Sequence, residues 1–344
     1  MTCWHHPEKK TSASLFLRLV LALASVAAVT PASAEDPIPA KTVYSFVVEN
    51  DAPTQQDQYY TSGARLEVSR EVHGGFNWER TLLHHVLRAS SKAQVVRDVA
   101  LNHAIFTPNE IEIANPQPGD RPWAGYLSGE YRLGSKEDQA IRSVALEIGV
   151  VGPASQADEI QTWLHTRVFD TDVPVGWDNQ IENEVGFILS YDNQFPAATL
   201  YGDIDRGVDV FLKTGGSAGT IRTDARLAGF IRAGTGLDQD LGVPRLNPAL
   251  SNSGFFQAKH GFDLYGFLGV EGRYVAHSVF LEGSLFREND PSVNVKRYVY
   301  DAQIGLVAHW GRMQTSVTFV RRSEEFETQS SAQEFMTLSI SFAR

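Results

Sequence analysis

Cysteine is almost absent from this sequence, and no long apolar run follows its first residues. The single cysteine is Cys3, so no disulfide can form within the chain, and stability must come from a large core or a closed sheet. After residue 34 no stretch approaches the ~20 apolar residues that a membrane-spanning helix needs. Helix-spanning membrane proteins are therefore excluded. A transmembrane β-barrel is not, because its strands alternate apolar and polar residues.

Positive charge is also scarce. The chain has 30 lysines and arginines against 41 aspartates and glutamates, a formal net charge of -11. This acidic balance argues against nucleic acid as a partner.

The first residues have the features of a secretory signal peptide. A positively charged start is followed by the apolar run 19–29, which is too short to span a bilayer. Ala32, Ser33 and Ala34 then supply a small-residue cleavage site. We therefore expect residues 1–34 to direct export, and residues 35–344 to form the mature domain.

The dominant pattern after the signal peptide has a period of two. In residues 143–151, Val144, Leu146, Ile148 and Val150 alternate with smaller or charged residues. Such alternation predicts strands with one apolar and one polar face. Many of these runs reach ten residues, longer than the usual ~5–6 of globular strands. That length suits tilted strands that cross a membrane.

The candidate strands number twelve or thirteen, because residues 205–234 can be read as one broken strand or two. Residues 278–285 are among the expected strands. A bacterial barrel needs an even number of strands, which favours twelve. The sequence therefore predicts an all-β fold, a twelve-stranded antiparallel transmembrane β-barrel that acts as a monomer in the outer membrane. A soluble sandwich is the alternative, because its polar face would look the same.

One segment, residues 154–169, has the spacing of a helix instead. Ile160 and Trp163 share an apolar face, and Gln161 and His165 share the opposite face because they are four residues apart. By strand alternation this helix lies in an extracellular loop. On most helices such a histidine faces solvent and does nothing.

Polar residues from distant segments are expected to meet at the same rim. Asn50 and Asp51 end the first strand, and Thr61 opens the second. Asn and Asp before a proline usually make only a turn. Convergence with other acceptors from the rim, among them Glu182, would instead suit a hard cation such as Ca²⁺. An imidazole beside the cation could act as a general base on water.

The order and spacing of six short motifs resemble the LpxR-type lipid A deacylase family of Gram-negative outer membranes. The motifs are "VEND", "YYTSG", "GDRPWAG", "EIGVVGP", "IQTWLH" and "GWDNQIENE". The resemblance implies a twelve-stranded barrel that removes the 3′-acyloxyacyl chain of lipid A by Ca²⁺-dependent ester hydrolysis. Lipid A, or lipopolysaccharide, and outer-membrane lipid are then the expected partners.

The resemblance also implies roles for individual residues. His165 would be the general base, Asn50 and Asp51 would lie on the metal side, and Thr61 and Gln161 would support the site. The carboxylate that family members carry after the histidine would be Asp170 or Asp172. Some members have an active-site lysine in the loop after the third strand, whereas here the first basic residue of that loop is Arg121. Either Arg121 replaces the lysine or the cation alone stabilises the oxyanion.

Two other functions compete with this one. A catalytically inert barrel, structural or pore-forming, would have the same strands, and the missing lysine favours it. An outer-membrane phospholipase would use a similar site on a different acyl ester. A serine hydrolase is disfavoured, because the sequence has no Gly-x-Ser-x-Gly elbow.

Overall fold

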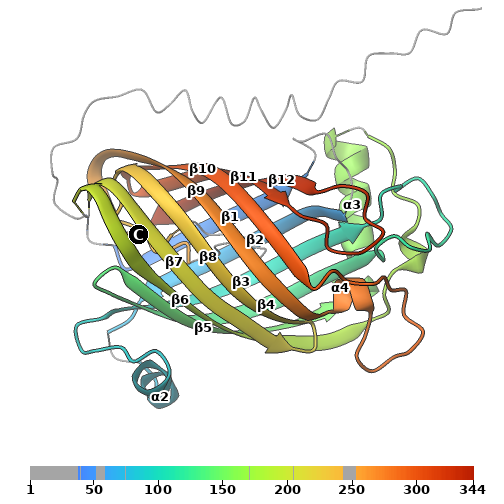
Figure 1. Cartoon of the computed structure of the whole chain (residues 1–344), viewed down its shortest axis with the longest axis horizontal. Helices are drawn as coiled ribbons and strands as arrows, with labels where there is room; N and C mark the ends of the chain where they lie inside the picture. The colour runs from blue at the N-terminus through green and yellow to red at the C-terminus, as the bar shows by residue number, and fades with distance from the viewer. Residues whose placement is uncertain are drawn as a thin grey trace, which may run out of the picture.

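The computed structural model describes residues 38, 40–51, 59–73, 75–169, 171–203, 205–242 and 253–344. The predicted signal peptide and Asp170 lie outside these residues. Within them, twelve antiparallel strands form a closed barrel (Figure 1). The strands are β1 (Thr42–Asn50), β2 (Tyr59–Glu71), β3 (Gln94–Thr107), β4 (Ala124–Glu137), β5 (Ala140–Val151), β6 (Glu184–Gly202), β7 (Arg206–Gly219), β8 (Arg222–Thr235), β9 (Lys259–Ser278), β10 (Tyr298–Gly311), β11 (Met313–Arg322) and β12 (Gln333–Ala343).

Each strand pairs with its neighbours in sequence, and β12 returns to β1. Val43 pairs with Ala343, so the first strand begins and the last strand ends at the same end of the barrel. We call this the terminus end and the opposite one the loop end. The closed sheet leaves no unpaired strand edge, which explains how a long β protein holds together without a disulfide.

The predicted count of twelve strands is confirmed. Residues 205–234 contain two strands, β7 and β8. The strand expected at 278–285 is wrong, because this stretch contains the short helix α4 (Val279–Glu282). Phe280 and Leu281 are both buried there, whereas consecutive side chains of a strand point to opposite faces of the barrel wall. None of the helices in the described ranges is long and apolar enough to cross a membrane.

The apolar and polar faces of the strands are arranged in the opposite way to those of a soluble protein. Large apolar side chains such as Leu66, Val99 and Leu268 are more than half exposed on the outer wall. Inside, Arg65 bonds Glu67 and Glu130, with its Nη2 atom 2.9 Å from Glu130 Oε1. The barrel therefore presents hydrocarbon outward and keeps its charges paired within the lumen.

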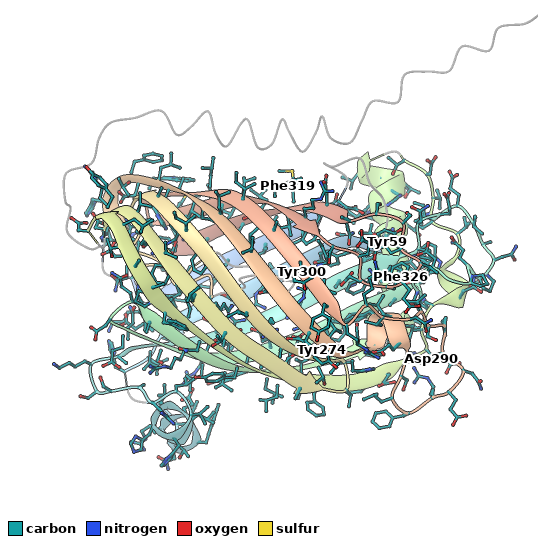
Figure 2. The ribbon with its side chains drawn as sticks, in the orientation of Figure 1. Tyr59, Tyr274, Asp290, Tyr300, Phe319 and Phe326 are labelled. Atoms are coloured by element: carbon teal, nitrogen blue, oxygen red, sulfur yellow. The ribbon has the colours of Figure 1, made fainter. Side chains whose placement is uncertain are left out.

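Both ends of the lumen are filled with side chains. At the terminus end, residues 253–258, just before β9, fold inward and bury Phe255 and Phe256, and Gly254 N donates to Glu67 Oε1 at 2.6 Å. At the loop end, Phe280 of α4 stacks on Phe106 with ring centroids 4.4 Å apart. The packed pair Tyr59 and Phe326 is labelled at this end (Figure 2). A lumenal cavity of about 90 Å³ remains beneath this cap.

Short helices flank the barrel at each end. At the loop end, the predicted helix at 154–169 is present as a 3-10 turn η2 (Pro153–Ser155), the helix α3 (Ala157–Trp163) and the π-helical turn η3 (Leu164–Phe169). The 3-10 turn η4 (Trp177–Asn179) follows in the same connection. At the terminus end lies α2 (Asn77–His85), which the period-two pattern did not predict.

Candidate active site at the loop end

The buried face of α3 and η3 is its polar face. Ala157, Gln161 and His165 are spaced by four residues, and each is at most 6% exposed. The apolar residues Ile160 and Trp163 are 37% and 57% exposed. The charged residues Glu159 and Arg167 are exposed as well, so the outer side of this helix mixes apolar and polar groups, as helices at a lipid interface do.

This helix lies on the outer side of the barrel wall. Ala157 packs with Ile105 of β3, whose side chain points away from the lumen. The Nε2 atom of His103, on the same face of β3, is 3.1 Å from the carbonyl oxygen of Ser155. Gly125 of β4 permits the approach, because a Cβ there would overlap the side chains of Ser155 and Ala157. Figure 1 shows α3 outside the strands at the loop end.

The His165 ring is held through its Nδ1 atom. Nδ1 is 2.6 Å from the backbone carbonyl oxygen of Asp172 and 3.2 Å from Thr171 Oγ1. A carbonyl oxygen can only accept, so Nδ1 carries the hydrogen, and in the neutral ring Nε2 is the basic nitrogen. The site residue Asp172 therefore contacts His165 through its main chain, and its side chain is exposed. The turn that places His165 is a π-helix, a local form often found at functional sites.

Asn50, Asp51 and Thr61 meet directly, as their places at the ends of β1 and β2 predicted. Asn50 Nδ2 donates to the Thr61 carbonyl oxygen at 3.1 Å, and Asp51 N donates to the same oxygen at 3.3 Å. A register shift between Tyr60 and Ser62 sets the direction of Thr61. Its hydroxyl lies 2.7 Å from that of Thr107. Asp51 and Thr61 are both buried.

Strand β3 connects these two groups of residues. Thr107, which contacts Thr61, and Ile105, which contacts Ala157, are two residues apart and so lie on the same outer face of β3. Sequence reasoning missed Thr107. The signal that could have found it is the pairing of the end of β3 with the start of β2, where Tyr59 faces Thr107.

Gln161 is oriented by a tryptophan that sequence reasoning also missed. Trp177 Nε1 donates to Gln161 Oε1 at 2.9 Å, and its ring packs on Trp123 with centroids 4.9 Å apart. Trp177 belongs to the "GWDNQIENE" motif, whose acidic residues were the expected ligands. Gln161 Nε2 is buried, and no hydrogen-bond acceptor reaches it among the residues described.

Glu182, another predicted cation ligand, has different surroundings. Glu182 is exposed and lies beside Arg287 in the β9–β10 connection, its Oε2 atom 3.9 Å from Arg287 Nε. No group of three or more His, Cys, Asp or Glu side chains within the described ranges could hold a metal ion. The cluster formed by Asn50, Asp51 and Thr61 instead offers the carboxylate of Asp51 with a neutral amide oxygen and a hydroxyl, because the Thr61 carbonyl oxygen already accepts two hydrogen bonds. Such a donor set fits Ca²⁺, which accepts neutral oxygens and water.

Arg121, the predicted candidate to replace the missing lysine, lies apart from the other candidate site residues. Its guanidinium lies 4.7 Å from the ring centre of Phe106 and 3.4 Å from Glu325 Oε2. Phe106 points into the lumen, whereas the neighbouring Thr107 points outward with Thr61. The structure therefore places Arg121 on the lumenal side of the wall and gives no support for a role at the outer site.

The closed twelve-stranded barrel, its apolar outer wall and a polar site at one rim define an outer-membrane β-barrel protein. The sequence matches the model of the outer membrane protein LpxR family over residues 16–344, and the chain belongs to that family.

The chain is also similar to solved structures. LpxR from Salmonella typhimurium has a TM-score of 0.68 and 18% sequence identity, and the match covers 87% of this chain and 99% of that chain. The β domain of the Bordetella autotransporter BrkA has a TM-score of 0.42 and 8% identity, with coverages of 88% and 98%. The first likeness supports the fold, and the second carries no further weight. Among curated proteins, none matches this sequence.

Proposed function

We propose that this protein is an outer-membrane lipid A deacylase that hydrolyses the 3′-acyloxyacyl ester in a Ca²⁺-dependent reaction. The observation that carries the proposal is the buried polar face of α3 and η3, where Gln161 and His165 lie against the outer side of the wall. A site there opens toward lipid acyl chains and not toward the lumen. Family membership supports the same reaction.

His165 is the proposed general base. With Nδ1 donating to Asp172, Nε2 can take a proton from a water molecule while its oxygen adds to the ester carbonyl carbon. The tetrahedral intermediate then collapses as the C–O bond to the sugar breaks. The imidazolium returns the proton to the leaving sugar oxygen. One water is consumed, and a carboxylic acid and an alcohol are released.

Two groups are proposed to stabilise the negative charge that develops on the carbonyl oxygen. Bound Ca²⁺, held by Asp51 with Asn50 and Thr61, would supply positive charge at that oxygen. Gln161 Nε2 adds neutral donors whose direction Trp177 fixes. The role of the missing lysine is thus shared between a cation and an amide.

The exposed apolar residues of the helix support a lipid substrate. Trp163 and Val168 project from the side of α3 and η3 that faces away from the wall, where they are 57% and 40% exposed. Acyl chains of the outer leaflet can pack against them while the ester reaches the buried polar face. The acidic chain must approach the phosphates of lipid A through divalent ions or local basic residues.

The test is the composition of lipid A in cells. The full chain is expressed in a Gram-negative host, and lipid A is analysed by mass spectrometry after incubation with Ca²⁺ or a chelator. Loss of an acyloxyacyl mass that requires both Ca²⁺ and His165 supports the proposal, and His165→Ala is the matched variant. An unchanged profile with Ca²⁺ contradicts it. Release of fatty acid from glycerophospholipids instead favours the phospholipase.

The filled lumen argues against the pore alternative. Phe255 and Phe256 occupy the terminus end and Phe280 the loop end, and the cavity beneath this cap measures about 90 Å³. A water-filled channel needs a continuous open path, which these side chains obstruct.

A further inference from the structure

The helix α2 exposes apolar and aromatic side chains to its surroundings. Phe76, Trp78 and Val86 are 61%, 50% and 41% exposed, on or beside a helix of nine residues. The rings of Phe76 and Trp78 stack with centroids 6.4 Å apart. So much exposed apolar surface on one short helix is costly in water and indicates contact with another medium.

The helix is nevertheless fixed against the barrel. Glu79 accepts hydrogen bonds from Arg97 Nε and Nη2, both at 2.7 Å, and from the hydroxyl of Tyr131. The Trp78 ring lies 5.3 Å from that of Tyr131. Arg97 and Tyr131 are on the outer faces of β3 and β4, so α2 is held beside the outer wall rather than at the mouth of the lumen.

Basic residues outnumber acidic ones around α2, although the whole chain has a net charge of -11 and the carboxylate of Glu137 accepts hydrogen bonds from Ser90 in the turn after the helix. Arg80, Arg88 and Lys92 are exposed on the helix and the turn after it. The acidic residue of the helix, Glu79, is buried and paired with Arg97. Local positive charge next to exposed aromatic rings is characteristic of helices that lie in an anionic lipid interface.

The position of α2 identifies which leaflet it would meet. Figure 1 shows it beside the strands at the terminus end, seen close to end-on, so that its axis runs across the long axis of the barrel. In an outer-membrane barrel this end, with both termini, faces the periplasm. The helix axis is therefore parallel to the membrane plane and level with the periplasmic, phospholipid leaflet.

We propose that α2 is an interfacial anchor that binds anionic phospholipids of the periplasmic leaflet. Phe76, Trp78 and Val86 insert among the upper acyl carbons, where aromatic side chains are favoured. Arg80 and Arg88 bind headgroup phosphates. The ion pair of Glu79 with Arg97 sets the depth at which the helix is held. This inference does not depend on the proposed enzymatic activity.

The test uses a fluorescent reporter on the helix. Cys3 is the sole cysteine and lies within the predicted signal peptide, so a Phe76→Cys variant of residues 35–344 can be labelled at one position with NBD. The labelled barrel is placed in nanodiscs of phosphatidylethanolamine with a minor fraction of brominated phosphatidylglycerol or brominated phosphatidylethanolamine. We expect blue-shifted emission and stronger quenching by the brominated phosphatidylglycerol. A label at Glu288, exposed at the loop end, is the control and should respond less.

A charge variant distinguishes lipid recognition from simple insertion. The single substitutions Arg80→Ser and Arg88→Ser should each weaken the preference for the anionic lipid roughly fivefold. Arg321→Ser, at an exposed site of the loop end, should leave it unchanged. The proposal is overturned if the emission of the label at position 76 is the same as in water. That result is expected if α2 instead binds a soluble protein. It is also overturned if the preference survives loss of both arginines.

Discussion

The indole N–H of Trp177 donates to Gln161 Oε1 at 2.9 Å, and both side chains are buried. An indole nitrogen can only donate, so this bond decides which end of the amide faces Trp177. Gln161 Nε2 is thereby directed toward the other side, on the helix face that it shares with His165. The bond is thus a means of aiming two N–H donors without a charged residue.

Replacing Trp177 with Phe should lower kcat about tenfold and leave KM nearly unchanged. The ring would be kept, but the buried amide oxygen would lose its donor, a loss worth roughly 1–3 kcal/mol. Steady-state kinetics on lipid A dispersed in detergent would measure this. The control is Trp310→Phe, because Trp310 lies near the end of β10 at the terminus end, away from the candidate site. A parallel rise in KM and loss of thermal stability would show a structural role only.

Replacing Gly125 with Ala should displace α3 from the wall. The new methyl group would overlap Ser155 and Ala157, and such overpacking costs about 1–3 kcal/mol. Activity should fall while the barrel still resists unfolding in cold SDS gels. Gly129→Ala is a matched control on the same strand, because nothing lies within 4 Å of a Cβ there. Equal activities of the two variants would contradict the placement of the helix.

Replacing Asp51 with Asn should raise the Ca²⁺ concentration for half-maximal activity at least tenfold, about 1.4 kcal/mol. The cluster around Thr61 would lose its carboxylate and keep only neutral oxygens. A Ca²⁺ titration of the deacylation rate measures the change. Asp178→Asn is the control, because Asp178 is exposed at the same end. An unchanged Ca²⁺ requirement would place the cation elsewhere.

Acid should release α2 from the barrel wall. Burial alone would raise the pKa of Glu79, but hydrogen bonds from Tyr131 and Arg97 bring it below its ordinary value of 4.5. The stabilisation that Glu79 gives is therefore fully present above that pH and is lost as the pH falls through the lower folded pKa. Exchange of the Val86 amide hydrogen, which bonds the Leu82 carbonyl oxygen, should accelerate relative to its intrinsic rate at each pH over that range. With Glu79→Gln this acceleration should disappear, and its persistence would exclude Glu79 as the cause.

Period-two alternation was sufficient to predict the barrel, because each strand has one apolar and one polar face wherever it crosses the membrane. It failed at residues 278–285, where Val279, Phe280 and Leu281 cap the lumen as a helical turn. Over so few residues, the pattern of apolar and polar residues cannot distinguish a strand from a short helix that caps the lumen. Contacts made across the barrel, and not the local pattern, decide the structure there.

The candidate site was predictable only in part, for a similar reason. Asn50, Asp51 and Thr61 end or begin paired strands, so their meeting follows from the topology. Trp177 lies 16 positions after Gln161 in a connection without regular period, and their hydrogen bond depends on how that connection folds. Gly125 carries no functional group that would mark it in the sequence, yet the absence of a side chain there leaves room for α3.

His165 is proposed to deliver water to an acyl ester at the outer rim. The most direct measurement is the isotopic composition of the released acid when the purified chain acts on lipid A with Ca²⁺ in ¹⁸O-labelled water. We expect one ¹⁸O atom in the carboxylic acid, none in the sugar alcohol, and almost no acid from the His165→Asn variant. Acid released by that variant at the wild-type rate would contradict this role of His165, and ¹⁸O in the alcohol would contradict attack on the ester carbonyl.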